Sequence, residues 1–192
     1  MRVPVVILAG GEGSRIGGAK PLRMLGGKTL LERAIEQASR WSDRPLLSLR
    51  NAGQYVSDAE AIEDEPGIEG PLAGLVAALR YAGREGAVTV LTVPVDMPQL
   101  PGDLMARLTK AMGDANAAIA ASGGALHPVC GLWRTAALGR VPAFLATRKR
   151  SLRGFAAHVG HVAVEWPDGP RDPFFNINDA ADLAAAEQRL RP

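Results

Sequence analysis

Residues 3–20 read VPVVILAGGEGSRIGGAK, and this stretch decides how the rest of the chain is interpreted. The apolar run at residues 3–8 predicts a buried β-strand, and the segment after it holds five glycines together with Arg15 and Lys20. Because glycine has no Cβ, the backbone N–H groups of such a loop can turn toward phosphate oxygens, and the two cations can neutralise the phosphate charge. The stretch therefore predicts a strand followed by a loop that binds a nucleoside triphosphate.

Two better-known glycine loops fit this region less well. A P-loop needs G-x-x-x-x-G-K-[ST], and residues 27–29 match its end, but Leu22 stands at the first glycine position. A dinucleotide-binding loop needs G-x-G-x-x-G, and the frame that begins at Gly11 puts Ile16 at the third glycine. The next strand-like run ends in Arg50 and not in an acid that could bind a ribose hydroxyl. Both patterns are therefore disfavoured.

Length and composition indicate one globular domain that covers residues 1–192, since 47% of the residues are hydrophobic and 22% are charged. No apolar stretch is long enough to span a bilayer, no signal peptide is evident, and the lone Cys130 cannot form an intramolecular disulfide. A net charge of +2 is too small to predict binding to bulk nucleic acid. We therefore expect a cytoplasmic protein without nucleic-acid or membrane partners.

Short apolar runs alternate with helix-like segments along the chain. The predicted strands cover residues 3–8, 46–49, 61–63, 87–95, 117–121, 129–133 and 162–166, and the predicted helices cover residues 29–41, 71–82, 101–112, 151–158 and 179–190. Thr29 and Glu32 have the spacing of a capping box at the start of the first helix. This alternation predicts an α/β fold with a three-layer, Rossmann-like and largely parallel sheet, which binds ligands at the carboxyl ends of its strands.

The longest apolar run, residues 87–95, predicts a central strand that is covered on both faces, and it ends at Asp96. A carboxylate at the end of a central strand, opposite a glycine loop, can hold Mg²⁺ while phosphates supply other ligands. The alternative is that Asp96 only caps the next segment. The metal site is the interpretation that we favour.

Several motifs agree with the nucleotide loop and follow one another in order along nearly the whole chain. They are L-A-G-G-x-[GS]-x-R-[MI]-G with a lysine after it (residues 8–20), AIED and GPLAG (61–64 and 70–74), VPVDMPQLP (93–101), HPV (127–129) and FNIN (175–178). Together they resemble the signatures of the molybdenum cofactor guanylyltransferases. The resemblance implies a nucleotide-diphospho-sugar transferase-like fold. It also implies an enzyme that transfers GMP from GTP to the terminal phosphate of molybdopterin and releases pyrophosphate, with Mg²⁺ as its cofactor.

The same resemblance assigns roles to individual residues. The implied catalytic residues are Arg15 and Lys20, which contact phosphates, and Asp96, which holds the metal. The implied GTP-binding residues are Leu8, Ala9, Gly10, Gly11, Gly13, Lys20, Asn51, Asp64, Gly70, Gly74 and Asp96. The implied pterin-binding residues are His127, Arg148, Arg150, Arg153, Asn176 and Asn178. Because a phosphate nucleophile is already ionised near neutral pH, this chemistry needs no strong general base.

Simpler interpretations stay open for some of these residues. Asp64 could be an ordinary loop carboxylate, His127 a histidine of the core or a turn, and Asn178 the cap of the last helix. The basic group at residues 148–153 could be a solvated loop. Gly74 stands inside a predicted helix, where glycine costs about 1 kcal/mol relative to alanine, so it predicts close packing or close approach of a ligand.

Other functions also stay open. A cytidylyltransferase that acts on the same pterin would have L-A-A-G where this chain has L-A-G-G at residues 8–11, and the second glycine favours guanine by resemblance. A non-catalytic nucleotide-binding protein or an NADP-dependent oxidoreductase could use the same glycines with Arg50. The expected partners are GTP and molybdopterin, with proteins that deliver or accept the cofactor.

Overall fold

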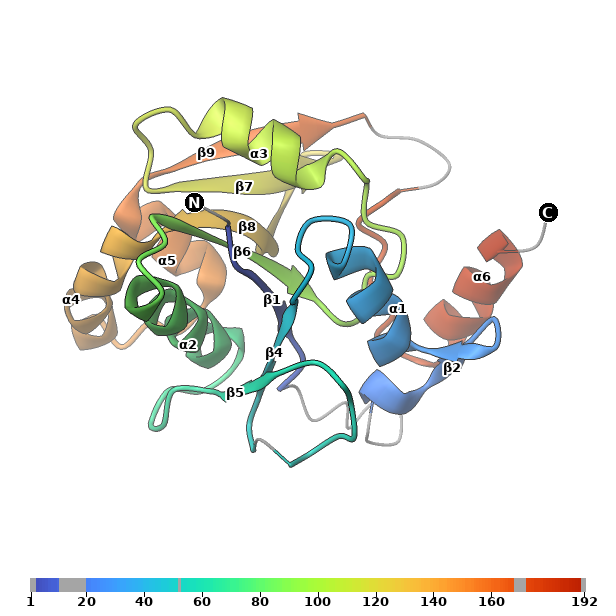
Figure 1. Cartoon of the computed structure of the whole chain (residues 1–192). Helices are drawn as coiled ribbons and strands as arrows, with labels where there is room; N and C mark the ends of the chain where they lie inside the picture. Colours follow the sequence, from blue (N-terminus) through green and yellow to red (C-terminus); the bar gives the residue numbers. More distant parts are fainter. Residues whose placement is uncertain (1–2, 11–19, 52, 168–171, 191–192) are drawn as a thin grey trace.

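The computed structural model describes residues 3–10, 20–51, 53–167 and 172–190 (Figure 1). Its strands are β1 (Val5–Leu8), β2 (Met24–Leu25), β3 (Lys28–Thr29), β4 (Leu46–Leu49), β5 (Ala61–Glu63), β6 (Thr89–Pro94), β7 (Ala117–Ser122), β8 (Ala125–Arg134) and β9 (His161–Trp166). Its α-helices are α1 (Leu30–Ala38), α2 (Pro71–Arg84), α3 (Leu104–Met112), α4 (Val141–Ala146), α5 (Leu152–Val159) and α6 (Ala180–Leu190), with the 3-10 helices η2 (Lys20–Leu22) and η3 (Thr135–Arg140).

The central sheet has seven strands in the order β5-β4-β1-β6-β8-β7-β9. β5, β4, β1 and β6 run parallel, β9 runs parallel to β7, and β8 is antiparallel to both of its neighbours. The predicted α/β fold with a largely parallel sheet is confirmed. The predicted strand at residues 129–133 is present as part of β8, but its antiparallel direction and its start at Ala125 were not predicted, because the two-residue turn before it is easily taken for a loop. Gly123 and Gly124 both have positive φ, as tight hairpin turns require, so β8 begins directly after β7.

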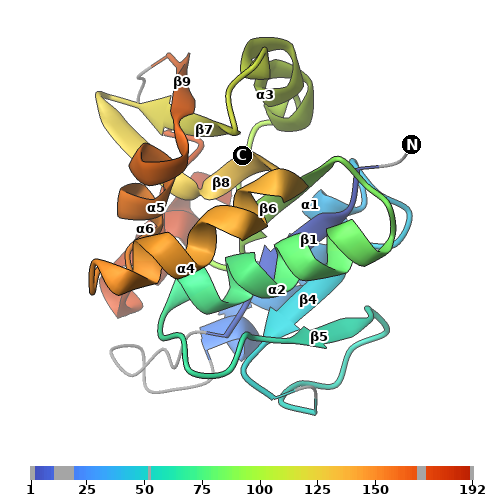
Figure 2. The same ribbon diagram turned by 90° about the vertical axis from the view of Figure 1, so that its left-hand side faces the viewer.

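Helices cover both faces of the sheet. Along β1, Val5 and Ile7 join a core with α1 and α3, whereas Val6 and Leu8 join a second core with α2, α4 and α5. Figure 2 shows α2, α4 and α5 in front of the sheet. Since successive side chains of a strand point to opposite faces, an uninterrupted apolar strand is the pattern of a sheet that is buried on both sides. The predicted three layers are therefore present.

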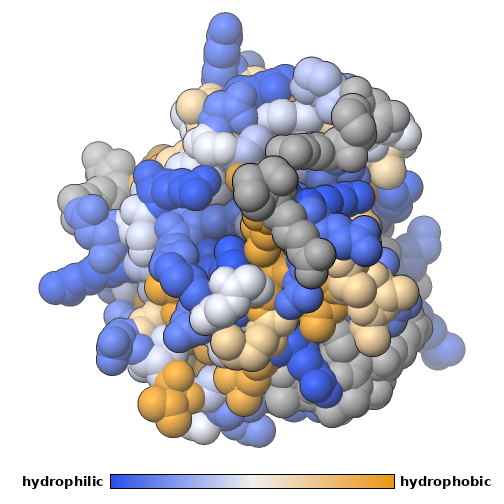
Figure 3. All heavy atoms as spheres, turned by 90° about the vertical axis from the view of Figure 1, so that its right-hand side faces the viewer, coloured by the Kyte–Doolittle hydropathy of each residue, from blue (hydrophilic) through white to orange (hydrophobic). Residues whose placement is uncertain are grey.

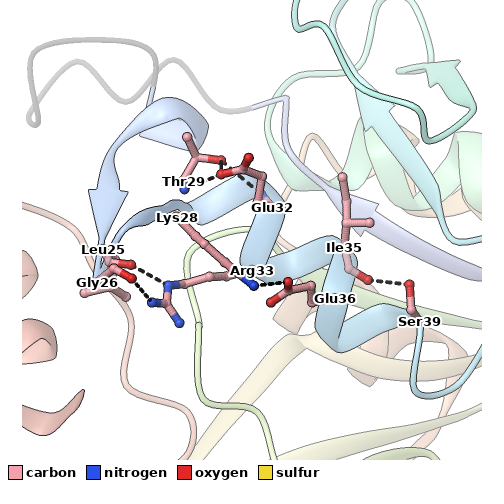
Figure 4. A network of polar contacts seen from close by, with 9 residues as sticks. All are labelled: Leu25, Gly26, Lys28, Thr29, Glu32, Arg33, Ile35, Glu36 and Ser39. Carbon is pink, nitrogen blue, oxygen red and sulfur yellow. Dashed lines mark hydrogen bonds and ion pairs between the residues drawn. The ribbon is translucent and has the colours of Figure 1, made fainter. Parts of the chain in front are cut away.

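The amino end of α1 contains the predicted capping box (Figure 4). The Thr29 hydroxyl accepts the Glu32 N–H at 3.1 Å, and the Glu32 carboxylate accepts the Thr29 N–H at 2.6 Å. Arg33 donates to the carbonyls of Leu25 and Gly26, which ties the β2–β3 hairpin to the same helix. These bonds fix α1 immediately after the segment that carries Lys20.

Replacing Thr29 by alanine should lower the free energy of unfolding by about 1 kcal/mol, since the first turn of α1 loses its side-chain acceptor. Urea unfolding followed by tryptophan fluorescence measures this difference. Glu36→Gln is the matched control on the same helix, because it removes only an exposed ion pair with Lys28 and should leave the midpoint unchanged. An equal loss in both variants would contradict the capping role.

The carboxy-terminal helix α6 lies beside the hairpin, where Leu25, Leu30, Ile177 and Ala186 form a small separate core. The side chain of Asp179 caps this helix by accepting the N–H groups of residues 181 and 182 at 2.9 Å. Figure 3 looks onto this side of the molecule and shows apolar surface interleaved with hydrophilic surface. The short helix α4 was not predicted, although Pro142 in its first turn is a usual start signal.

Within the described ranges, no helix combines the length and the apolar character that are needed to cross a bilayer.

Candidate active site

A cavity of about 1160 Å³ lies at the carboxyl ends of the parallel strands. Gly10 follows β1, Arg50 follows β4, Asp64 follows β5 and Asp96 follows β6, and all four line the cavity. The lining also contains Leu8, Ala9, Lys20, Gly70, Gly74, Asn176 and Asn178. Parallel α/β sheets bind their ligands at this edge, because the loops after neighbouring strands meet there. The cavity is therefore the candidate active site.

Lys20 and Asp96 form an ion pair inside the cavity. Lys20 Nζ lies 2.5 Å from Asp96 Oδ2, and the two side chains are 13% and 18% exposed. The backbone carbonyl of Asp96 accepts the Ile177 N–H at 3.0 Å, which places the segment that carries Asn176 and Asn178 beside the end of β6. A bound polyphosphate would here meet one cation and one carboxylate that are already close together.

Asp64 forms a second polar centre on the wall made by β4 and β5. Its Oδ1 accepts a hydrogen bond from the Ser48 hydroxyl at 2.5 Å, and its backbone N–H donates to the Leu49 carbonyl at 2.8 Å. Burial raises the pKa of the Asp64 carboxyl, and the Ser48 hydrogen bond and the charge of Arg50 offset this in part. The carboxylate thus has one oxygen committed to the protein.

Gly10 and Gly74 leave the space that the Asp64 carboxylate occupies. A Cβ at Gly10 would overlap Asp64 Oδ2, and one at Gly74 would lie 3.2 Å from Asp64 Oδ1 and 2.9 Å from Ser48 Oγ. Gly70 has a φ of 70° and is the N-cap of α2, whose first residue is Pro71. The positive end of the α2 dipole therefore lies at the cavity wall, where it favours negative charge.

The two asparagines predicted for the pterin side line the cavity, whereas His127 does not. His127 Nε2 is 2.8 Å from Ser122 Oγ, and its ring stacks on Phe174 with centroids 4.7 Å apart. Burial lowers the pKa of His127, although Asp172 and Glu165 act in the opposite direction. Among the described residues, the buried Oδ1 of Asn176 has no hydrogen-bond partner, so it is available to a ligand donor.

The remaining predicted site residues lie elsewhere. Arg150 donates to the carbonyls of Leu145 and Lys149, Arg153 donates to the carbonyl of Leu126, and neither residue lines the cavity. Arg148, with a φ of 60°, and Asn51 are also outside its lining. Gly11, Gly13 and Arg15 fall outside the described residues.

Sequence reasoning did not single out Ser48, Glu63 or Glu65 as part of this site, nor Arg50 as a residue of the GTP site. A signal for Ser48 was present, because it is the polar residue in the otherwise apolar run LLSL at residues 46–49. A hydroxyl in a strand that is buried on both faces needs a buried partner. Glu63 ends β5 and Glu65 lies in the loop after it, and the sequence does not define the course of that loop along the cavity.

The donor set limits which metal complex the site could hold. In the part of the chain that the structure describes, no group of three His, Cys, Asp or Glu side chains is arranged to bind a metal ion. Mg²⁺ is usually held by one or two carboxylates, with phosphates and waters as its other ligands. The single carboxylate of Asp96 therefore fits a magnesium ion that arrives with a nucleotide, and not a fully protein-bound ion.

Comparison with known proteins gives a consistent result. Residues 5–162 match the family described as MobA-like NTP transferase domain. The chain is 43% identical to the molybdenum cofactor guanylyltransferase of Sinorhizobium fredii, over 98% of this chain and 92% of that protein. It is 38% identical to the protein of the same name from Cereibacter sphaeroides, over 100% and 98% of the two chains.

Solved structures agree with the sequence relatives. The molybdopterin-guanine dinucleotide biosynthesis protein A of Archaeoglobus fulgidus superimposes with a TM-score of 0.78 at 25% identity, over 97% of this chain and 98% of that one. The 2-C-methyl-D-erythritol 4-phosphate cytidylyltransferase of Thermus thermophilus has the same fold, with a TM-score of 0.69 at 23% identity over both full chains. The predicted nucleotide-diphospho-sugar transferase-like fold is thereby confirmed. The chain belongs to the MobA-like NTP transferase family, and within it to the molybdenum cofactor guanylyltransferases.

Proposed function

We propose that this protein transfers GMP from GTP to the terminal phosphate of molybdopterin, which releases pyrophosphate and forms the guanine dinucleotide cofactor. The observation that carries the proposal is the cavity at the sheet edge, where the Lys20–Asp96 pair and the Asp64 centre line one space. The relatives that are named molybdenum cofactor guanylyltransferase support the choice of substrates. GTP and molybdopterin are accordingly the two small-molecule partners that we propose.

The reaction needs positioned charge more than it needs a base. A phosphate oxygen of the pterin attacks the α-phosphorus of GTP, the new P–O bond forms, and the bond to pyrophosphate breaks with its electron pair on the leaving oxygen. The attacking phosphate is already ionised near pH 7, so no proton has to be removed from it. Lys20 donates to the phosphates and stabilises the charge that develops on them, and we assign Arg15 the same role.

We propose that Asp96 holds the Mg²⁺ ion that accompanies GTP. When bound, such an ion would supply neutralisation of phosphate charge. The negative carboxylate is the hard oxygen ligand that magnesium favours, and its pairing with Lys20 keeps it compensated in the free protein. Lys20 would then move from this pair toward the phosphates as GTP enters.

The GTP site that we propose follows the cavity wall. We assign Leu8, Ala9 and Gly10 at the end of β1 to the phosphates, and we give Gly11 and Gly13, which fall outside the described residues, the same role. Asp64, Gly70 and Gly74 would enclose the nucleoside. Asn51 does not line the cavity, but it follows Arg50, which does, and we propose that it contacts the nucleotide from there. We place the pterin on the opposite side, beside Asn176 and Asn178, where the unpartnered Oδ1 of Asn176 can accept a hydrogen bond.

His127 contacts Ser122 and Phe174 and does not line the cavity, so we assign it an indirect role on the pterin side. Arg148 and Arg150 lie in the loop before α5 and Arg153 lies in its first turn, so they would reach the pterin phosphate only if this segment turned toward the cavity. We propose that proteins which deliver molybdopterin or accept the product dock near this rim, and that the enzyme acts in the cytoplasm. No observation specifically favours cytidylyl transfer or hydride transfer.

Base choice gives the direct test of the proposal. Turnover with GTP should exceed turnover with CTP by well over tenfold, a difference above roughly 1.4 kcal/mol in transition-state binding. The physical reason is that Gly10 and Gly74 leave room for the Asp64 carboxylate, an acceptor that suits the adjacent N1–H and 2-amino donors of guanine, whereas cytosine offers only its amino group. The protein is incubated with molybdopterin, Mg²⁺ and each nucleoside triphosphate in turn, and the product is identified by mass.

Release of pyrophosphate should accompany the product in equal amount. A preference for CTP would move the protein to cytidylyl transfer. Nucleotide binding without pyrophosphate release would refute the enzymatic proposal, and a change in nicotinamide absorbance would favour an oxidoreductase.

A further inference from the structure

Ser48 is a buried polar residue that the reaction described above does not use. Its side chain is 0% exposed, and it stands in β4 between apolar neighbours. A buried hydroxyl without a partner costs about 1–3 kcal/mol, so serine at this position needs a reason. Its hydrogen-bond acceptor is Asp64 Oδ1 at 2.5 Å, and Asp64 belongs to the wall of the candidate active site.

The Asp64 carboxylate is held on several sides. Ser48 binds Oδ1 from β4, the backbone of Gly74 approaches Oδ1 from α2, and the backbone of Gly10 approaches Oδ2 from the end of β1. Each of these three neighbours is small, and two of them have no Cβ that could fill the space. Gly10, Gly74 and Asp64 all line the cavity, and Oδ2 is the oxygen that Ser48 leaves without its hydrogen bond. The hydrogen bond to Ser48 therefore selects one rotation of the carboxylate.

We propose that Ser48 is a positioning residue for the nucleoside of bound GTP, because its hydroxyl fixes Asp64 Oδ1 and presents Oδ2 to the nucleoside. This inference rests on the proposed function, since it takes GTP as the ligand. An ionised carboxylate is an acceptor only, and the guanine N1–H, the guanine 2-amino group and the ribose hydroxyls are the donors that a nucleoside offers. Ser48 itself does not contact the ligand.

The first experiment measures binding and does not depend on turnover. Guanosine and inorganic pyrophosphate are titrated separately by calorimetry into the wild-type protein and Ser48→Ala. Guanosine should bind about tenfold more weakly to the variant, the scale of one hydrogen bond to a charged group, because Asp64 is no longer held. Pyrophosphate should bind as in the wild type. In turnover assays, the KM for GTP should rise while kcat at saturating GTP stays within about twofold.

A matched pair of substitutions separates the hydroxyl from the packing. Ser48→Thr and Ser48→Val have side chains of nearly the same shape, and only threonine can donate to Asp64. The added methyl group changes the packing of β4 in both variants, so its effect on the free energy of unfolding and on binding is shared by the pair. Guanosine should therefore bind about tenfold more tightly to Ser48→Thr than to Ser48→Val. Equal affinities in this pair would overturn the proposal even if both variants bind more weakly than the wild type.

The pH dependence of guanosine binding gives a further readout. The groups around Asp64 are Ser48, Arg50, Glu63 and Glu65, with the Lys20–Asp96 pair elsewhere in the cavity lining. Burial raises the Asp64 pKa and the Ser48 hydrogen bond lowers it, so removal of the hydroxyl should raise it further. The ionised form binds, so affinity is lost as pH falls through this pKa. As the pH is lowered, guanosine affinity should therefore begin to fall at a higher pH in Ser48→Ala than in the wild type.

Thr92→Val supplies the structural control, because Thr92 is also 0% exposed and hydrogen-bonded in the sheet, with Gly131 and Trp133, but it does not line the cavity. Thr92→Val should lower the melting temperature without changing the guanosine affinity or the pH at which that affinity is lost. If Ser48→Ala weakens guanosine and pyrophosphate equally, its role is only structural and the inference fails. If Asp64→Asn weakens guanosine but Ser48→Ala does not, the inference also fails while the proposed function stands. If the wild type binds no guanosine or GTP, the proposed function itself fails.

Discussion

Replacing Asp96 by asparagine is expected to lower turnover with GTP by about 10³-fold or more at limiting Mg²⁺, while the fold survives. The substitution keeps the shape of the side chain and removes the charge that magnesium requires. Loss of a preorganised electrostatic group in a partly buried site acts on the transition state, where phosphate charge develops. The side chain is only 18% exposed, so water cannot replace the lost charge effectively.

Binding should respond differently from turnover in this variant. Without Mg²⁺, GTP should bind Asp96→Asn as tightly as it binds the wild type, or more tightly. The reason is that a negative charge has gone and Lys20 no longer has a carboxylate partner. Initial rates over a Mg²⁺ titration and calorimetry without the metal measure the two effects.

Asp103→Asn is the control, because Asp103 is an exposed carboxylate outside the cavity. A folded Asp96→Asn enzyme with a near wild-type rate at limiting Mg²⁺ would show that Asp96 is not the metal ligand.

Lys20→Ala should lower turnover by about 10²–10³-fold and should weaken GTP binding much more than guanosine binding. The lysine contacts phosphates in the proposed complex, so a ligand without phosphates does not sense its loss. Removal of the cation also leaves the Asp96 carboxylate uncompensated, and this charge then repels the phosphates. Dissociation constants for GTP, GMP and guanosine, measured at one salt concentration, separate these contributions.

Lys28→Ala is the matched control for Lys20, since Lys28 lies in the neighbouring hairpin, is about half exposed and pairs with Glu36. It should bind all three ligands as the wild type does. Equal weakening of GTP and guanosine in Lys20→Ala would refute the placement of Lys20 on the phosphates.

Much of the parallel half of the sheet could be predicted from sequence, because β1, β4 and β6 are short, mostly apolar and almost wholly buried. The observed β4 and β5 have the predicted bounds of residues 46–49 and 61–63. The capping box of Thr29 was equally visible, since it depends on residues three positions apart. Patterns of this kind involve residues that are close together in the chain, so a single sequence is enough to identify them.

The antiparallel strand and the Asp64 centre were harder to predict, for two different reasons. β8 depends on the turn at Gly123 and Gly124, whose φ values decide between a hairpin and a loop. The residues packed around the Asp64 carboxylate, Gly10, Ser48 and Gly74, come from three separate parts of the chain. No regular spacing in the sequence indicates that they meet. Motif resemblance pointed to the two glycines as nucleotide contacts. The structure adds that each also leaves room for a protein carboxylate.

The hydrogen bond between the Ile177 N–H and the Asp96 carbonyl has a consequence for the order in which the protein matures during translation. All seven strands of the sheet have been synthesised by residue 166, but the wall that carries Asn176 and Asn178 comes later. Leu25 and Leu30 are buried partly by Ile177 and Ala186, so a nascent chain that ends before these residues exposes both leucines beside Lys20. Since domains begin to fold from the amino terminus as they emerge, the sheet can form on the ribosome before the cavity is closed. The enzyme should therefore gain activity only after its last helix has left the ribosome and docked.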